Sequence, residues 1–263
     1  MSTALLVQLS IQTWTARKLD KKATQSTVEA YGAVNESGRF HKALLGKTAL
    51  KSVNTAAHRL RDFHYENTLA ASGGMAVLPS SNYFDYINGV ASLTEEFDKA
   101  VAEFKTKYKS LVSEASTELS GLYNESDYPT DIDSKFGVKT AFLPIPDNEE
   151  WKQKLDIQDD GASEMLETAV EDLRSRFLTQ VTKAYARASD KDHVFKQGTL
   201  DHLFDLVDSA PKLNFTDDEA ISEASEALTD LLSKTDAEDI RNDPLVRALT
   251  AEVLKDIMET LEC

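Results

Sequence analysis

The sequence predicts a mainly α-helical protein: a helical bundle with one long coiled-coil-like helix and a small β element. The 263 residues include only 10 Gly and 6 Pro, fewer than the turns of an all-β protein of this size require. Apolar residues recur every three or four positions through most of the chain, which is the helical period. Only two short stretches have a strand-like pattern.

The N-terminal region is expected to begin with a strand and to continue as helices. Apolar residues alternate over Leu5–Ile11, as in a half-buried strand. A helix is predicted from about Trp14 to Ala30, ending at Gly32, where the absence of a Cβ permits a left-handed cap. Residues 35–46 are polar and predict a mobile connector. A second amphipathic helix should run from Thr48 to about Leu69.

The longest predicted element is a helix from about Tyr83 to Leu122, preceded by a capping turn at residues 78–82. Its apolar stripe sustains about four heptads, which is typical of a coiled-coil arm or of the spine of a bundle. Such a stripe must be covered by its own chain or by another, so a homo-oligomer is one possibility. The stripe comprises Val90, Leu93, Phe97, Val101, Phe104, Tyr108, Leu111 and Ala115.

The remaining chain is expected to hold one strand and several helices. Val138–Leu143 is rich in β-branched and aromatic residues, and nearby prolines favour an edge strand, paired with the N-terminal one. A helix should run from about Ala162 to Ala188, followed by shorter helices with capping-box starts at Thr216 and Thr235. Two regions are therefore expected, 1–122 and 123–263, or one continuous domain.

The charge is distributed unevenly along the chain. Met1–Arg61 contains ten Lys/Arg and three Asp/Glu, a net charge of +7, and the other residues carry −23, which together give −16. One interpretation is a basic arm that meets phosphates beside an acidic body that repels them. The other is that the two parts neutralise each other within one fold.

Cysteine usage and hydropathy indicate the compartment. The single cysteine, Cys263, cannot form an intrachain disulfide or a zinc knuckle, which favours a reducing cytosol. The apolar stretch Ala4–Leu9 is short and lacks a preceding basic region, so it is not a signal peptide. No window reaches the roughly 18 apolar residues that a membrane span needs. A cytoplasmic protein without membrane contact is therefore expected.

No catalytic motif is recognisable, so the chain is predicted not to be an enzyme and to use no cofactor. There is no nucleophile elbow and no glycine-rich dinucleotide loop. The run Gly46-Lys47-Thr48 ends like a phosphate-binding loop, but His41 stands where the first glycine belongs. His58 and His64 are not spaced for one metal site, and His64 is expected to be packed or half-buried.

One segment approaches the pattern of a calcium loop. Oxygen-bearing side chains stand at the ligand positions and Gly161 at the tight turn, but a glutamine replaces the usual Asp or Asn at position 3. Ser163 also replaces the apolar residue that normally pins the loop. We therefore favour the alternative, in which the acidic residues cap the following helix. The candidate ligands are Asp156, Gln158, Asp160, Glu164 and Glu167.

Basic and aromatic residues combine in a pattern that suits single-stranded nucleic acid, which needs positive charge beside stacking faces. Four of the cations, from Arg17 to Lys22, would crowd one side of the predicted helix. The alternative is that the aromatic residues belong to the core. The candidate nucleic-acid-binding residues are Arg17, Lys18, Lys21, Lys22, Arg59 and Arg61, with Tyr83 or Tyr86 for stacking.

Several segments together resemble a protein family of bacteriophage and prophage genomes that is catalogued as a domain of unknown function. They include residues 9–20, 63–69, 78–86, 127–129, 142–146 and 211–216, in the same order along most of the chain. The resemblance implies a phage accessory protein in the host cytoplasm, with some members encoded near a MoxR-type AAA+ ATPase and a von Willebrand-type domain protein. It also implies a strand at about Trp151–Ile157, which argues against the calcium loop.

Three hypotheses of function follow. The first is a non-enzymatic phage adaptor acting through protein–protein contacts in phage DNA metabolism, with a AAA+ ATPase or replication proteins as partners. The second is a single-stranded DNA-binding protein that uses the basic N-terminal arm. The third is an acidic DNA mimic or anti-defence protein.

Overall fold

The computed structural model describes residues 4–34, 37–145, 161–190 and 192–262. The chain folds into two compact units that are interleaved in sequence. Unit 1 comprises Met1–Gln8, Phe63–Ile87 and Thr140–Cys263, and unit 2 comprises Leu9–Asp62 and Asn88–Lys139. The boundary expected after residue 122 therefore falls inside unit 2. Mainly helical structure is confirmed, together with a larger sheet than the sequence predicted.

The main sheet has four antiparallel strands in the order β4-β5-β1-β6. The strands are β1 (Ala4–Gln12), β4 (Leu69–Ala70), β5 (Ala76–Pro79) and β6 (Gly137–Pro144). The expected pairing of the N-terminal strand with an edge strand at 138–143 is confirmed, since β1 and β6 are neighbours and β6 lies at the edge.

Sequence periodicity missed the two strands β4 and β5 of the sheet, and burial explains why β5 was missed. All four of its residues are buried, so they show no alternation of apolar and polar side chains. Leu78 pairs with Leu5, and Pro79 pairs with Ala4 in the same antiparallel ladder. The turn expected at residues 78–82 therefore begins two residues late, as the 3₁₀ turn η2 (Ser80–Asn82).

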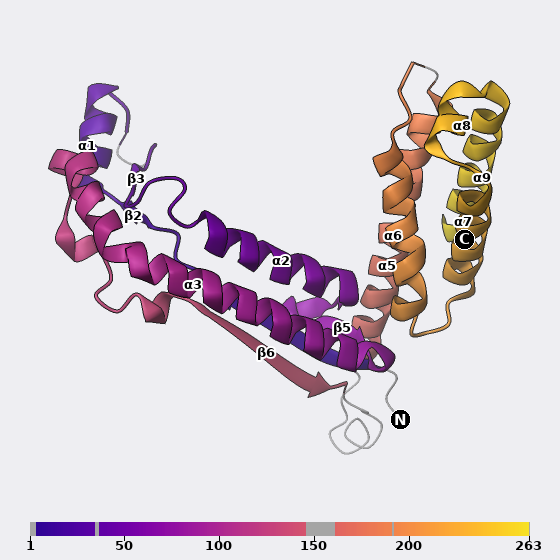
Figure 1. The fold of residues 1–263 in the computed structure, drawn as a ribbon, viewed down its shortest axis with the longest axis horizontal. Helices are drawn as coiled ribbons and strands as arrows, with labels where there is room; N and C mark the ends of the chain where they lie inside the picture. The colour runs from indigo at the N-terminus through magenta and orange to yellow at the C-terminus, as the bar shows by residue number, and fades with distance from the viewer. Residues whose placement is uncertain (1–3, 35–36, 146–160, 191, 263) are drawn as a thin grey trace. The chain divides into compact units, whose positions relative to one another are not determined.

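The C-terminal part of unit 1 is a helical bundle (Figure 1). Its helices are α5 (Gly161–Ser189), α6 (Gln197–Leu213), α7 (Glu219–Lys234), α8 (Ala237–Asn242) and α9 (Pro244–Glu262). Fully buried residues at helical spacing form its core, among them Phe177, Leu203, Leu228 and Leu254. No helix in the described part of the chain is long and apolar enough to cross a membrane.

The starts of the last helices differ partly from the predicted capping boxes. Asp218 and Asp236, rather than Thr216 and Thr235, cap α7 and α8 by accepting backbone N–H groups. A carboxylate at this position also interacts favourably with the helix dipole. Helix α9 is also capped by an aspartate, because the carboxylate of Asp243 accepts the Leu245 N–H at 2.8 Å.

Unit 2 is built on most of the long helix α3 (Tyr83–Leu119, 37 residues), flanked by η2 and by the 3₁₀ turn η3 (Ser120–Leu122). The predicted long helix is thus confirmed. Helix α2 (Lys51–Asn67) runs alongside it in Figure 1. Phe97, Val101 and Phe104 of the apolar stripe are buried within the chain itself.

The helix predicted over residues 14–30 is wrong in its first half. Arg17–Leu19 form strand β2, and helix α1 begins only at Lys21 and ends at Ala30. The side chain of Asp20 explains the boundary, because it accepts the Ala23 N–H at 2.9 Å and so caps α1.

The predicted mobile connector at 35–46 is also partly wrong. His41–Ala43 form strand β3, which pairs with β2 in an antiparallel two-stranded sheet. In this register Lys18 lies opposite Lys42. We call residues 13–34 and 37–50, which contain β2, α1, β3 and their turns, the head of unit 2.

A buried ion cluster attaches the head to the segment that follows α3. The ammonium of Lys42, only 5% exposed, lies 2.8 Å from the carboxylate of Asp127 and 3.2 Å from that of Asp20. It also donates to the Leu122 carbonyl at 2.6 Å, and the Tyr128 hydroxyl donates to the Leu44 carbonyl at 2.8 Å. These contacts join three segments that are distant in sequence.

The contacts within this ion cluster shift the pKa values of Asp20 and Lys42. The Ala23 N–H and the Lys42 ammonium hold the pKa of Asp20 below its ordinary value. The neighbouring carboxylates, first that of Asp127, raise the pKa of Lys42 despite the opposing effect of burial. Both shifts favour the charged forms of Asp20 and Lys42, as their ion pair requires.

Replacing Lys42 by Met should destabilise the head, because two carboxylates would lose their shared cation. Breaking a buried ion pair on one side costs on the order of 3 kcal/mol. Urea unfolding and faster amide hydrogen exchange in β2 and β3 would measure the effect. Lys18→Met, at the exposed position opposite in the register, is the matched control and should change neither quantity. Equal behaviour of the two variants would contradict this role for Lys42.

Candidate functional site

The head of unit 2 presents a group of exposed cations. None of them has a carboxylate within salt-bridge distance in the described part of the chain. Asp20, which lies between Lys18 and Lys21 in the sequence, is already bound to Lys42. The positive charge of the group is therefore not neutralised locally. Its members are Arg17, Lys18, Lys21, Lys22, Arg39 and Lys47.

Exposed aromatic and apolar side chains accompany these cations. Tyr31, which follows α1, is 84% exposed, and Phe40, next to Arg39, is 37% exposed. The Phe40 N–H donates to the Thr24 hydroxyl at 3.0 Å, and the Asp20 N–H donates to the Phe40 carbonyl at 2.9 Å. These bonds hold the segment before β3 against α1.

Two hollows open on the head. The α1 cleft, of about 560 Å³, is lined by Leu19, Lys21, Val28 and Arg39 among others. The Trp14 cleft, of about 360 Å³, is lined by Trp14, Arg17, Gly46, Lys47 and Asn54 together with apolar residues. Neither lining includes a carboxylate, so both hollows favour anionic groups.

The structure groups four of the predicted cations, but not on one helix. Arg17 and Lys18 lie on β2, and Lys21 and Lys22 begin α1, so the expected single helical face does not exist. All four nevertheless belong to the head. Sequence reasoning missed Arg39, Lys47 and the exposed Tyr31 and Phe40. The run Arg39-Phe40-His41-Lys42 was the available signal.

The remaining predicted cations lie on α2. Arg59 forms an ion pair with Glu96 of α3, so part of its charge is neutralised. Arg61 is exposed on the same helix. Neither residue belongs to the head as defined above.

The predicted stacking residues occupy different environments. Tyr86 is fully buried, and its hydroxyl lies 2.7 Å from Nδ1 of His64, so its ring is not available to a nucleic-acid base in this fold. Tyr83 is half-buried and packs edge-on against Phe84 and Phe142, each with ring centroids 5.4 Å apart. The alternative of core aromatics thus holds for Tyr86. Half-burial of His64, as predicted, is confirmed.

The two units differ strongly in charge. Unit 2 contains 16 Lys/Arg and 14 Asp/Glu, a net charge of +2, and unit 1 contains 13 Lys/Arg and 31 Asp/Glu, a net charge of −18. Nearly all the excess negative charge therefore belongs to one unit. The charge asymmetry seen along the sequence is a difference between folded units.

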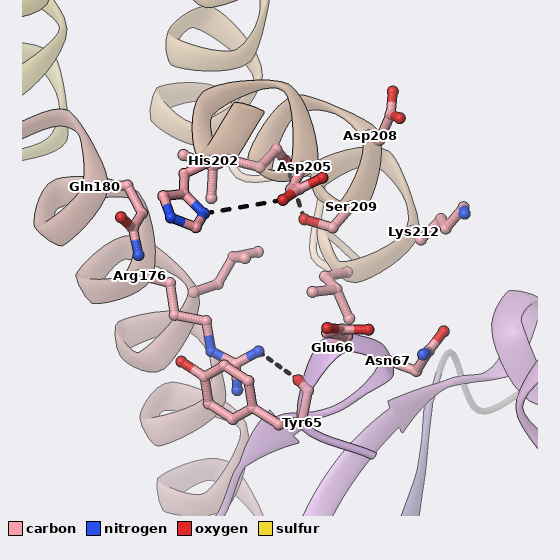
Figure 2. A pocket seen from close by; sticks show the side chains of 13 residues that line it. Tyr65, Glu66, Asn67, Arg176, Gln180, His202, Asp205, Asp208, Ser209 and Lys212 are labelled. Atoms are coloured by element: carbon pink, nitrogen blue, oxygen red, sulfur yellow. Dashed lines mark hydrogen bonds and ion pairs between the residues drawn. The ribbon is translucent and has the colours of Figure 1, made fainter. Parts of the chain in front are cut away.

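A third hollow lies in unit 1, between the end of α2 and helices α5 and α6 (Figure 2). Its volume is about 400 Å³. The guanidinium of Arg176 lies 3.7 Å over the ring of Tyr65 and donates to the Tyr65 carbonyl at 2.7 Å. Its second partner is the carboxylate of Asp172, which also accepts the Ala70 N–H at 2.8 Å.

Charges of both signs line this unit 1 cleft. Asp205, Asp208 and Glu66 bring carboxylates, and Lys212 and Arg176 bring cations. Arg176 uses its terminal nitrogens within the protein, and its buried Nε has no hydrogen-bond partner. The mixed lining does not select a phosphate, in contrast to the hollows of the head.

The metal hypothesis gains no support from the described residues, where no group of His, Cys, Asp and Glu is arranged to hold a metal ion. Three of the candidate calcium ligands, Asp156, Gln158 and Asp160, lie outside the described residues. Glu164 and Glu167 lie in α5.

Comparisons with known proteins give no relative. No family model, no curated protein and no solved structure matches the chain. The resemblance to the phage family therefore depends on the sequence segments alone.

The His64–Tyr86 pair should make unit 1 sensitive to acid. Burial, and secondarily the charge of Arg176, lowers the pKa of His64 below its ordinary 6.5, while burial raises the pKa of Tyr86. The unfolded chain then binds more protons than the folded one just below pH 6.5, so stability should fall as the pH drops through that range.

Urea midpoints measured between pH 7.5 and 5 test this prediction. His64→Gln retains a polar partner for Tyr86 and should flatten the pH dependence below pH 6.5. His58→Gln, at an exposed position on the same helix, should leave it intact. An unchanged profile in the His64 variant would show that this residue does not cause the loss.

Proposed function

We propose that the chain is a non-enzymatic accessory protein that binds single-stranded DNA through the head of unit 2. Its setting is the phage DNA metabolism that the resemblance implies. The observation that carries the proposal is the group of six exposed cations without carboxylate partners in the described chain, on a head that also exposes Tyr31 and Phe40.

Two physical arguments favour a single strand as the ligand. Lysines and arginines contact phosphates without regard to sequence, and the release of counterions supplies much of the binding free energy. Aromatic faces stack on bases only where those bases are unpaired, as in a single strand. Cations and exposed rings together therefore fit single-stranded better than double-stranded DNA.

The acidic unit 1 supplies the second part of the proposed role. Its net charge of −18 repels DNA and would restrict binding to the head. Leu245 and Leu249 lie one turn apart on α9 and are 67% and 52% exposed. Such a pair on an acidic surface suits a protein partner. An adaptor that brings DNA to a AAA+ ATPase or a replication protein would combine both surfaces.

DNA binding is tested by fluorescence anisotropy of labelled oligothymidylate across a salt series. The intact chain should bind, and its affinity should fall steeply with salt. A triple variant with Lys18, Lys21 and Lys22 changed to Gln should bind more weakly. Its log–log salt slope should be smaller by up to about 2, because single-stranded contacts contribute about 0.7 per charge. Double-stranded DNA of the same length should bind less tightly.

A variant with Lys99, Lys107 and Lys109 changed to Gln is the matched control. These lysines are exposed on α3, outside the head, and the variant loses the same charge. Equal weakening by the two variants would contradict a binding site on the head. If the intact chain does not bind DNA at low salt, the DNA-binding hypothesis is rejected and the protein-adaptor hypothesis remains. Inhibition of another DNA-binding protein without any binding to DNA would instead indicate the DNA mimic.

A further inference from the structure

We infer that the Trp14 cleft holds one nucleotide of the bound strand, with the base against the indole of Trp14 and the phosphate between Arg17 and Lys47. This inference rests on the proposed function and specifies one site within the head. Its basis is the combination of a fixed indole, two cations and an open glycine around one hollow of about 360 Å³.

The indole of Trp14 is held in place by the neighbouring rings of α3. It packs edge-on against Tyr108, with ring centroids 5.9 Å apart, and in a tilted arrangement against Phe104 at 6.5 Å. The side chain is only half-buried and contributes to the lining of the cleft. Because the ring is already ordered, stacking a base on it costs little conformational entropy.

The backbone at Ala16 brings Trp14 and Arg17 to the same hollow. Ala16 is buried and has a φ of 49°, in the left-handed region that an alanine seldom adopts. Its carbonyl accepts the Leu44 N–H at 2.7 Å, which stabilises this conformation. The chain therefore turns sharply between the aromatic residue and the cation.

Charge and polarity of the lining match a nucleotide. Arg17 comes from β2 and Lys47 from the turn before α2, so two separate segments bring cations to one hollow without a carboxylate. Both cations are exposed. The amide of Asn54 adds donors and an acceptor of the kind that base edges use. The unit 1 cleft lacks this selectivity because carboxylates line it.

Gly46 is one of the residues that line the cleft. A Cβ added at this position would meet no heavy atom within 4 Å, and the backbone there does not require glycine. A substitution at this lining position is therefore expected to be accommodated without strain in the surrounding structure. The volume of the cleft is at the lower end of the range of small-ligand sites, about 300–1,000 Å³, which suits a single nucleotide.

The fluorescence of Trp14 can report whether a base binds in this cleft. The chain contains two tryptophans, Trp14 and Trp151, so Trp151→Phe leaves Trp14 as the only one. Oligothymidylate should quench the fluorescence of this variant saturably, at the concentrations at which anisotropy reports binding. The reciprocal variant Trp14→Phe should show no such quenching. Stacking and contact with the base are the physical reason for the difference.

Two further variants test separately the effect of filling the cleft and the effect of removing its positive charge. Gly46→Val leaves the net charge unchanged and should reduce both the quenching and the affinity, the latter about tenfold. Arg17→Gln with Lys47→Gln should do the same. The control is Lys18→Gln with Lys22→Gln, which removes the same charge outside the cleft. It should bind DNA more weakly, but the quenching of Trp14 at saturating DNA should be unchanged.

The outcomes distinguish this inference from the proposed function. Binding by anisotropy without a change at Trp14 would overturn the nucleotide site and leave the DNA-binding head intact. Quenching by inorganic phosphate alone, to the same extent as by DNA, would show an anion site without base contact and would also overturn it. An absence of binding by every method would overturn both.

Discussion

The ammonium of Lys42 is the interaction on which the head of unit 2 depends. It is almost fully buried, yet it belongs to the most basic stretch of the chain, and it binds Asp20, Asp127 and the carbonyl of Leu122. The same contacts have an electrostatic consequence. Because Asp20 is bound to a buried cation, it is not available to neutralise the exposed ones around it. One structural lysine therefore both fixes the head and leaves its surface positive.

The difference in net charge between the two units determines where a polyanion would be attracted. Sequence order suggests a basic arm followed by an acidic body, but the folded units are interleaved, and unit 2 as a whole is close to neutral. The head contains seven Lys/Arg but only two Asp/Glu, whereas acids such as Glu95 and Glu103 lie on α3. A polyanion would therefore meet attraction on one part of unit 2 and repulsion from unit 1, which is how a protein of net charge −16 can be proposed to bind DNA.

Long-range periodicity predicted the fold well where one pattern dominates. The 37-residue helix α3 and the helix α5 follow from the spacing of apolar residues, and β6 was predicted from its composition and the nearby prolines. Prediction failed where a local interaction overrides periodicity. The cap at Asp20 and the left-handed Ala16 divide the helix expected at 14–30, and complete burial removes the alternation of β5.

The candidate site was predicted in composition but not in geometry. Arg17 and Lys21 were expected on one helix, but Arg17 lies on a strand of the head and Lys21 on a helix. Tyr86 was a reasonable stacking candidate by residue type, but its hydrogen bond to His64 belongs to a buried cluster that no sequence pattern reveals. The most direct test of the account is ultraviolet cross-linking of the intact chain to oligothymidylate, with the attached peptides mapped by mass spectrometry. Cross-links are expected within residues 13–34 and 37–50, and cross-links confined to helices α5–α9 would contradict DNA binding by the head.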